Sequence, residues 1–353
     1  MSREKRKLDH IHLAMEESTS VQSHFDLIRL IHLSLPEVNL AETNLSTSIS
    51  GVPLHSPIFI NAMTGGAKSV KEINRKLAHV AKETGIAMAV GSQRAALQKP
   101  ELWETFQVVR DVNPKGVVIA NLGADSTWDD VGQAIDMLKA DILQLHLNVP
   151  QELVMPEGDR SFVGILQNIA TLVDRVNIPV IVKETGFGMC RETYHQLIDI
   201  GVQIVDVSGG GGTDFIAIEN KRRTQSDYSH LQAWGQSTAI SLLESLSCQD
   251  QLTVLSSGGI RNTLDIAKSL ALGAQAVGIA GLFLRILQTE GMTALIQYIQ
   301  SWHQQLHTIM TMLGIRELAA FKHVPLVVQG ELTNWCKARQ IDWRGLANRH
   351  LQS

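Results

Sequence analysis

The sequence has few cysteines, few aromatic residues and no long apolar run, and these shortages exclude several classes of protein. Its three cysteines, Cys190, Cys248 and Cys336, are far apart and form no CxxC pair, so neither a disulfide framework nor a zinc cluster is indicated. No apolar run reaches the ~18 residues of a membrane span, and the charged first residues lack the apolar core of a signal peptide. We therefore expect a cytoplasmic protein without a membrane partner.

An excess of positive charge is also missing. The 353 residues carry a formal net charge of -4, so no basic field would attract nucleic acid, although a local basic patch can still hold a small anion. The composition, 44% hydrophobic and 19% charged, is that of an ordinary globular enzyme with ample material for a core. We expect a small-molecule partner and no nucleic acid.

What the sequence does contain is one repeated unit: a short apolar run rich in β-branched residues, a polar or glycine-containing loop, and a helical pattern. Helical segments such as residues 70–85 and 263–274 separate the apolar runs. There are eight such runs, at residues 57–63, 86–92, 116–122, 141–147, 178–184, 202–208, 252–257 and 276–281.

Alternating strands and helices predict an α/β fold with a parallel sheet, and eight units match a (β/α)8 TIM barrel, which typically takes about 250 residues. A doubly wound sheet is the alternative, but the first loop, "MTGGAKSV", contains no GxGxxG. We predict a single domain, 1–353, with a barrel core at about 57–290. An N-terminal arm, 1–56, and a C-terminal helical extension, 290–353, would flank it, and residues 290–314 read as one long helix packed on the barrel or on a neighbouring subunit.

In a TIM barrel the active site lies at the carboxyl ends of the strands, and polar residues follow the predicted strands here. Glycine clusters in "GGGGT" (209–213), "SSGGIRN" (256–262) and "IAGLF" (279–283) follow the last three. Glycines make plain tight turns, but three clusters at consecutive strand ends favour a phosphate site. A phosphate there, with polar groups around the barrel mouth, suits flavin mononucleotide (FMN). Those polar groups are Thr64, Ser92, Asn121 and Lys183, with Thr213 as a further hydroxyl donor.

Lys183 admits three readings from its position at the end of an apolar strand. It can be a Schiff-base nucleophile, the partner of the neighbouring Glu184 in a plain ion pair, or a cation beside a reduced, anionic flavin.

Several motifs resemble those of type 2 isopentenyl diphosphate isomerases. They are "RKLDHI" (6–11), "NAMTGG" (61–66), "VGSQRAAL" (90–97), "ANLG" (120–123), "QLHLN" (144–148), "QELVMPEGDRSF" (151–162), "VKETGFGM" (182–189) and "GGGGTDF" (209–215). The resemblance implies a (β/α)8 fold and interconversion of isopentenyl and dimethylallyl diphosphate. It also implies FMN that is active when reduced, NADPH or NADH as the reductant, Mg2+, and a homo-tetramer or homo-octamer.

The resemblance also assigns roles to residues of this sequence. Catalytic roles fall on Lys183, His146 and Gln151, and Mg2+ on Glu152. The diphosphate substrate would be bound by Arg6, Lys7, His10, Arg94, His146, Asn148 and Gln151. FMN would contact Ala62, Met63, Thr64, Ser92, Asn121, Lys183, Ser208, Thr213, Gly258, Gly259, Ala280 and Gly281. Thr185 and Cys190 depart from the Val and Ser common in relatives, and this leaves every proposed ligand intact.

Two other classes remain open. An FMN-dependent oxidoreductase would share the barrel: the α-hydroxy-acid oxidase type needs an active-site His paired with arginines, and the IMP dehydrogenase type needs a nucleophilic cysteine after the sixth strand. The segment after that strand, residues 209–223, contains no cysteine. A flavin-binding protein without catalysis would not need the polar residues after the fourth strand, where "MPEGDR" can also be read as a plain solvated loop.

Two further patterns carry less weight. His303 and His307 are spaced to bind a metal from one helix face, but the sequence offers no third ligand. Cys190 has no evident base to make it a nucleophile.

Overall fold

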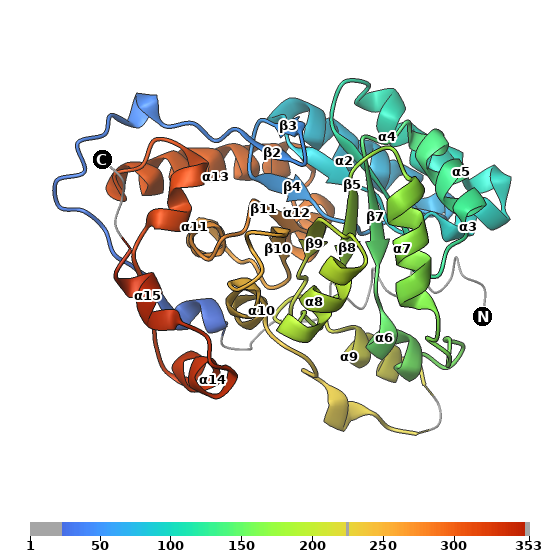
Figure 1. Cartoon of the computed structure of the whole chain (residues 1–353). Coiled ribbons are helices and arrows are strands. Elements are labelled where there is room, and N and C mark those ends of the chain that lie inside the picture. Colours follow the sequence, from blue (N-terminus) through green and yellow to red (C-terminus); the bar gives the residue numbers. More distant parts are fainter. Residues whose placement is uncertain (1–22, 224–225, 350–353) are drawn as a thin grey trace.

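The computed structural model describes residues 23–223 and 226–349, and its centre is a closed barrel of eight parallel strands (Figure 1). Around the barrel the strand order is β10-β11-β4-β5-β6-β7-β8-β9. The strands are β4 (Ile58–Ile60), β5 (Ala87–Ala89), β6 (Val118–Gly123), β7 (Ile142–His146), β8 (Val180–Lys183), β9 (Ile204–Asp206), β10 (Thr253–Ser257) and β11 (Ala276–Ile279).

Each barrel strand lies in one of the eight predicted runs, with β6 extending one residue further. The strands read as nearly continuous apolar runs because the barrel interior buries one face and the outer helices bury the other. The prediction of a (β/α)8 TIM barrel is therefore confirmed.

Helices separate the strands and cover the outside of the barrel (Figure 1). The predicted helix at residues 70–85 is α2, and it ends at Gly85, which adopts the left-handed conformation with φ of 70° that is common at helix ends. The helices are α2 (Lys71–Thr84), α3 (Arg94–Gln98), α4 (Glu104–Val112), α5 (Trp128–Leu138), α6 (Val149–Val154), α7 (Ile165–Arg175), α8 (Arg191–Asp199), α9 (Phe215–Lys221), α10 (Thr238–Ser245), α11 (Thr263–Ala271) and α12 (Gly281–Thr289).

A short hairpin of β2 (Thr47–Ile49) and β3 (Val52–Leu54) packs against the barrel interior. Ile49 and Leu54 are buried in one apolar cluster with Phe59 and other inward-facing strand residues. Because β3 directly precedes β4, the hairpin closes the amino-terminal end of the barrel. The opposite end, where polar residues follow the strands, is left for a site.

The two ends of the described chain meet outside the barrel. β1 (Ile28–Leu30) pairs antiparallel with β12 (Leu326–Val328), joining segments about three hundred residues apart. The predicted long helix is α13 (Met292–Met312), which packs on α2, α11 and α12, and it is followed by α14 (Glu331–Arg339) and α15 (Trp343–Ala347). None of the helices in residues 23–223 and 226–349 is long and apolar enough to cross a membrane.

Candidate active site

A cavity of about 1100 Å³ opens at the carboxyl ends of the barrel strands. It brings together every expected site residue that the structure describes, from all eight strand ends. Arg6, Lys7 and His10 lie outside the described residues. The expected residues that line the cavity are Ala62, Met63, Thr64, Ser92, Arg94, Asn121, His146, Asn148, Gln151, Glu152, Lys183, Ser208, Thr213, Gly258, Gly259, Ala280 and Gly281.

The three glycine loops meet at one side of this cavity. Gly258 has φ of +92°, and a Cβ atom there would lie 2.0 Å from the carbonyl oxygen of Gly209. Gly259 has φ of +69°, and a Cβ atom there would lie 2.9 Å from the carbonyl carbon of Gly211. A Cβ on Gly281, the first residue of α12, would lie 3.6 Å from the Thr213 hydroxyl. Glycine backbone forms much of the wall here, which is the kind of surface that a phosphate group needs.

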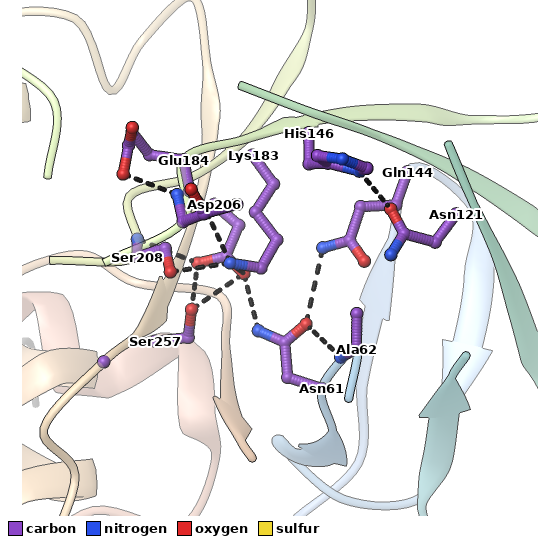
Figure 2. Close-up of polar contacts among 12 residues, drawn as sticks. Asn61, Ala62, Asn121, Gln144, His146, Lys183, Glu184, Asp206, Ser208 and Ser257 are labelled. Atoms are coloured by element: carbon purple, nitrogen blue, oxygen red, sulfur yellow. Dashed lines mark hydrogen bonds and ion pairs between the residues drawn. The ribbon is translucent and has the colours of Figure 1, made fainter. Parts of the chain in front are cut away.

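Lys183 ends β8 and is buried at the floor of the cavity (Figure 2). Its Nζ donates to the Ser208 hydroxyl at 2.6 Å and to the backbone oxygen of Glu184, and it lies 3.9 Å from Oδ2 of Asp206. Ser208 holds a left-handed φ of 35°, uncommon for a residue other than glycine. Such strain is typical of functional positions that the surroundings fix.

Burial lowers the pKa of Lys183, and the charges of Asp206 and Glu184 oppose that shift. Glu184 turns its carboxyl away from the lysine and accepts hydrogen bonds from the backbone N–H groups of Thr185 and Phe187, the latter at 2.7 Å. Burial raises the pKa of Glu184 to about 8. The predicted alternative of a simple Lys183–Glu184 side-chain pair is therefore not what the geometry shows.

His146, the last residue of β7, hydrogen-bonds through Nδ1 to Oδ1 of Asn121 at 3.0 Å (Figure 2). Burial, together with the Lys183 charge, lowers the pKa of His146 to about 4, so the ring is neutral at pH 7. Because an amide oxygen only accepts, Nδ1 carries the proton and Nε2 keeps its lone pair.

The segment "MPEGDR" is largely exposed, as the alternative of a solvated loop expects, but hydrogen bonds hold it against the carboxyl end of α6. Arg160 donates to the backbone oxygens of Glu152 and Met155 at 2.7 and 2.8 Å, and also to those of Gly158 and Asp159. Glu152 accepts from Asn148 Nδ2 at 2.8 Å on one carboxylate oxygen and from the Asp159 N–H at 2.9 Å on the other. The loop therefore fixes the orientation of the Glu152 carboxylate.

The Gln151 side chain is held by a hydrogen bond to α9, which packs beside α6. Its Nε2 donates to Oε1 of the buried Glu219 in α9 at 3.2 Å, so its own carbonyl oxygen is directed elsewhere. Arg222 pairs with the other oxygen of Glu219 and also with Glu157 of the loop, at 2.7 Å. Glu219 and Arg222 lie in no apolar run, so no pattern in the sequence singled them out.

Arg94, a residue expected to bind the substrate, forms an ion pair with Asp125 in the structure. The two residues follow neighbouring strands, β5 and β6, and both line the cavity. Asp125 raises the pKa of Arg94, against the opposing effect of burial. Arg261 and Arg285 also line the cavity, on the side of the glycine loops, and the sequence pattern did not single them out.

His303 and His307 serve as hydrogen-bonding residues on α13. His303 contacts the Ser56 hydroxyl at 2.9 Å and His307 the Thr43 hydroxyl at 2.6 Å, which attaches the segment before the barrel to this helix. Within residues 23–223 and 226–349, no three His, Cys, Asp or Glu side chains are grouped to hold a metal ion.

Sequence comparison identifies full-length relatives. The chain is 48% identical over 340 residues to the isopentenyl-diphosphate delta-isomerase of Staphylococcus haemolyticus, covering 96% of this chain and 97% of that protein. It is 46% identical over 340 residues to the Staphylococcus aureus protein of the same name, with the same two coverages. The chain belongs to the isopentenyl-diphosphate delta-isomerase family. The resemblance seen in the motifs is thereby confirmed.

Two further comparisons concern the barrel of this isomerase family member. A family model described as FMN-dependent dehydrogenase matches residues 157–327. Among solved structures, a flavocytochrome b2 mutant with benzoylformate matches with a TM-score of 0.66 and 18% identity, covering 93% of this chain and 80% of that one. A mandelate oxidase mutant with an FMN adduct matches with a TM-score of 0.62 and 16% identity, covering 91% and 92%. At these identities the likeness concerns the fold alone.

Proposed function

We propose that this protein interconverts isopentenyl diphosphate and dimethylallyl diphosphate by a 1,3 shift of a proton, in isoprenoid biosynthesis. The observation that carries the proposal is the single cavity in which the glycine loops, Lys183 and the polar residues of α6 all converge. The full-length relatives named as isopentenyl-diphosphate delta-isomerases support it.

The described residues fit FMN. The glycine loops leave room for a phosphate where a Cβ at Gly258 would collide with backbone, and a buried cation, Lys183, stands across the floor. When bound and reduced, FMN would supply the acid and base group for proton addition and removal. Lys183 would hold positive charge beside the flavin ring, while Asn121 and Ser208 keep the neighbouring His146 and Lys183 side chains in place.

The diphosphate would be bound on the α6 side of the cavity. Its binding energy positions the alkene, which is a weak base and needs both precise placement and exclusion of water. Arg94 would supply charge by exchanging its Asp125 partner for the diphosphate. Asn148 and Gln151 would add polar contacts, together with His146 and with Arg6, Lys7 and His10 of the N-terminal arm, 1–56.

Glu152 would bind Mg2+. A hard carboxylate oxygen suits this ion, which keeps several waters and commonly takes further ligands from substrate phosphates. One protein carboxylate is therefore a sufficient contribution, and the loop at Asp159 and Arg160 holds that carboxylate in a fixed orientation.

The experiment that tests the proposal is an anaerobic assay of isopentenyl diphosphate with Mg2+, FMN and NADPH or NADH, with product identified by NMR. The purified protein should be yellow, and isomerisation should require the reductant. Full turnover with oxidised FMN and no reductant contradicts the proposed role of the flavin. Oxidation of a 2-hydroxy acid or of IMP, without isomerisation, would instead establish the oxidoreductase alternative.

We further propose that residues 1–353 form one catalytic domain that assembles as a homo-tetramer or homo-octamer in the cytoplasm. NADPH or NADH would serve only to reduce the flavin, since the isomerisation has no net redox change. Size-exclusion chromatography with light scattering tests the assembly, and a monomer at micromolar concentration would rule it out.

A further inference from the structure

Asp206 is a fully buried carboxylate just beneath the cavity, and four residues that do line the cavity surround it (Figure 2). Ser257 donates to it at 2.7 Å, Asn61 Nδ2 at 2.8 Å and the Ser208 N–H at 3.2 Å. Nζ of Lys183 lies 3.9 Å away. These partners come from or directly follow β4, β8, β9 and β10, so one side chain joins four strand ends.

The contacts of Asp206 are those of a negative charge. The Nδ2 amino group of Asn61, the backbone N–H of Ser208 and the ammonium of Lys183 can only donate, and they approach both oxygens of the carboxyl. A buried charge is tolerated when it is paired and hydrogen-bonded in this way.

The other carboxyl close to Lys183 is in a less favourable position to carry charge. Burial raises the pKa of Glu184 to about 8, which disfavours its charged form. Its carboxyl group also accepts a hydrogen bond from the backbone N–H of Phe187 in the following loop. Asp206 is therefore the group that can balance the Lys183 ammonium.

We propose that Asp206 is a positioning residue of this site. From beneath the cavity, its negative charge keeps Lys183 protonated and holds the ammonium group at the cavity floor. The inference rests on the proposed function for the part that concerns FMN. The charge pairing itself concerns only this chain's own residues.

The first test is a double-mutant cycle on the full chain without added FMN, with urea unfolding as the readout. Lys183→Met leaves Asp206 unbalanced and Asp206→Asn leaves Lys183 unbalanced, so each should lower the unfolding midpoint. The double variant should lose clearly less than the sum of the two losses. Additive losses would overturn the pairing, and this result does not depend on FMN or on isomerase activity.

The second test measures the FMN midpoint potential, which a purely structural residue would not shift in a defined direction. A nearby cation favours the more negative, reduced flavin, so Lys183→Met should lower the potential. Asp206→Asn should lower the potential by a smaller amount than Lys183→Met does. Because Lys183 then becomes neutral, neither position carries a charge, and the potential should equal that of the double variant. The matched control Glu184→Gln should leave the potential unchanged.

The sign of the shift decides the inference. If Lys183 keeps its proton without Asp206, only a negative charge has been removed. The potential of Asp206→Asn will then be equal to or higher than the wild-type potential. That outcome overturns the proposal. Failure of the chain to bind FMN would count against the proposed function instead, and the unfolding cycle would still decide the Lys183–Asp206 pairing.

Discussion

The side-chain amide of Asn148 donates to Oε1 of Glu152 at 2.8 Å, one turn of α6 away. The carboxylate is thereby oriented before any ligand arrives, in the manner of an outer partner of a metal ligand. The pairing leads to the first prediction.

Glu152→Gln should abolish most of the Mg2+ dependence and most turnover while FMN retention is kept, because a neutral amide is a weak ligand for a hard cation. Asn148→Ala keeps the Glu152 carboxylate but removes the hydrogen bond that orients it, so the Mg2+ concentration for half-maximal activity should rise about 10-fold. Activity measured across a Mg2+ titration tests both variants. An unchanged titration curve for Glu152→Gln would place the metal on other residues.

Arg160→Ala should loosen the loop over α6 without touching the flavin side of the cavity. Arg160 holds the backbone oxygens of Glu152 and Met155, so we expect KM for the diphosphate to rise about 10-fold with FMN retention intact. Arg160→Lys is the matched variant, since one ammonium cannot reach every carbonyl that the guanidinium fork contacts. Loss of FMN together with the rise in KM would point to general unfolding.

Gly258→Ala should lose FMN retention or fail to fold, because the new Cβ would lie 2.0 Å from a backbone oxygen at a φ of +92°. Gly132→Ala is the control. A Cβ there meets nothing within 4 Å and Gly132 lies inside α5, so this change should stabilise the protein by about 0.5–1 kcal/mol. Thermal melting and FMN absorbance measure both, and a Gly258→Ala protein that retained FMN normally would contradict the proposed phosphate wall.

Stability should fall as the pH drops from about 6.5 to about 4. Burial lowers the pKa of both His146 and His303 to about 4, whereas an unfolded histidine titrates near 6.5. Between these values the unfolded state binds more protons, so stability is complete above about 6.5 and decreases toward pH 4.

His303→Gln should flatten this pH dependence, because glutamine can still contact Ser56 but does not titrate. Melting temperatures at pH 7.5 and pH 5 measure the effect, and the exposed His230→Gln serves as the control. An equal loss of melting temperature in His303→Gln and the wild type would remove His303 as a source of the pH dependence.

The barrel could be predicted because the signal is local. Each strand is a short apolar run buried on both faces, and the eight runs alternate with helical patterns. The cavity residues followed from the same logic, since parallel strands bring their carboxyl ends to one side. For this reason the sequence alone assigns residues as distant as Thr64 and Gly281 to one site, and both line the cavity.

What could not be predicted depends on pairing between distant segments. Asp206 stands inside an apolar run, and nothing local reveals that its partners come from three other strands. The Arg94–Asp125 ion pair joins two loops, and β1 and β12 are three-residue strands without a repeating pattern. Such contacts depend on tertiary placement, which side-chain periodicity does not encode.

The pairing of β4 with β11 and of β1 with β12 has a consequence for synthesis on the ribosome. The first barrel strand, β4, can pair early with β5, but its other neighbour, β11, is absent until residues near Ile279 have been translated, and β1 must wait for Val328. Until then β4 presents an unpaired edge, which is the kind of surface that promotes aggregation. Late closure should make the incomplete chain prone to aggregation, so expression at lower temperature should increase the yield of folded protein.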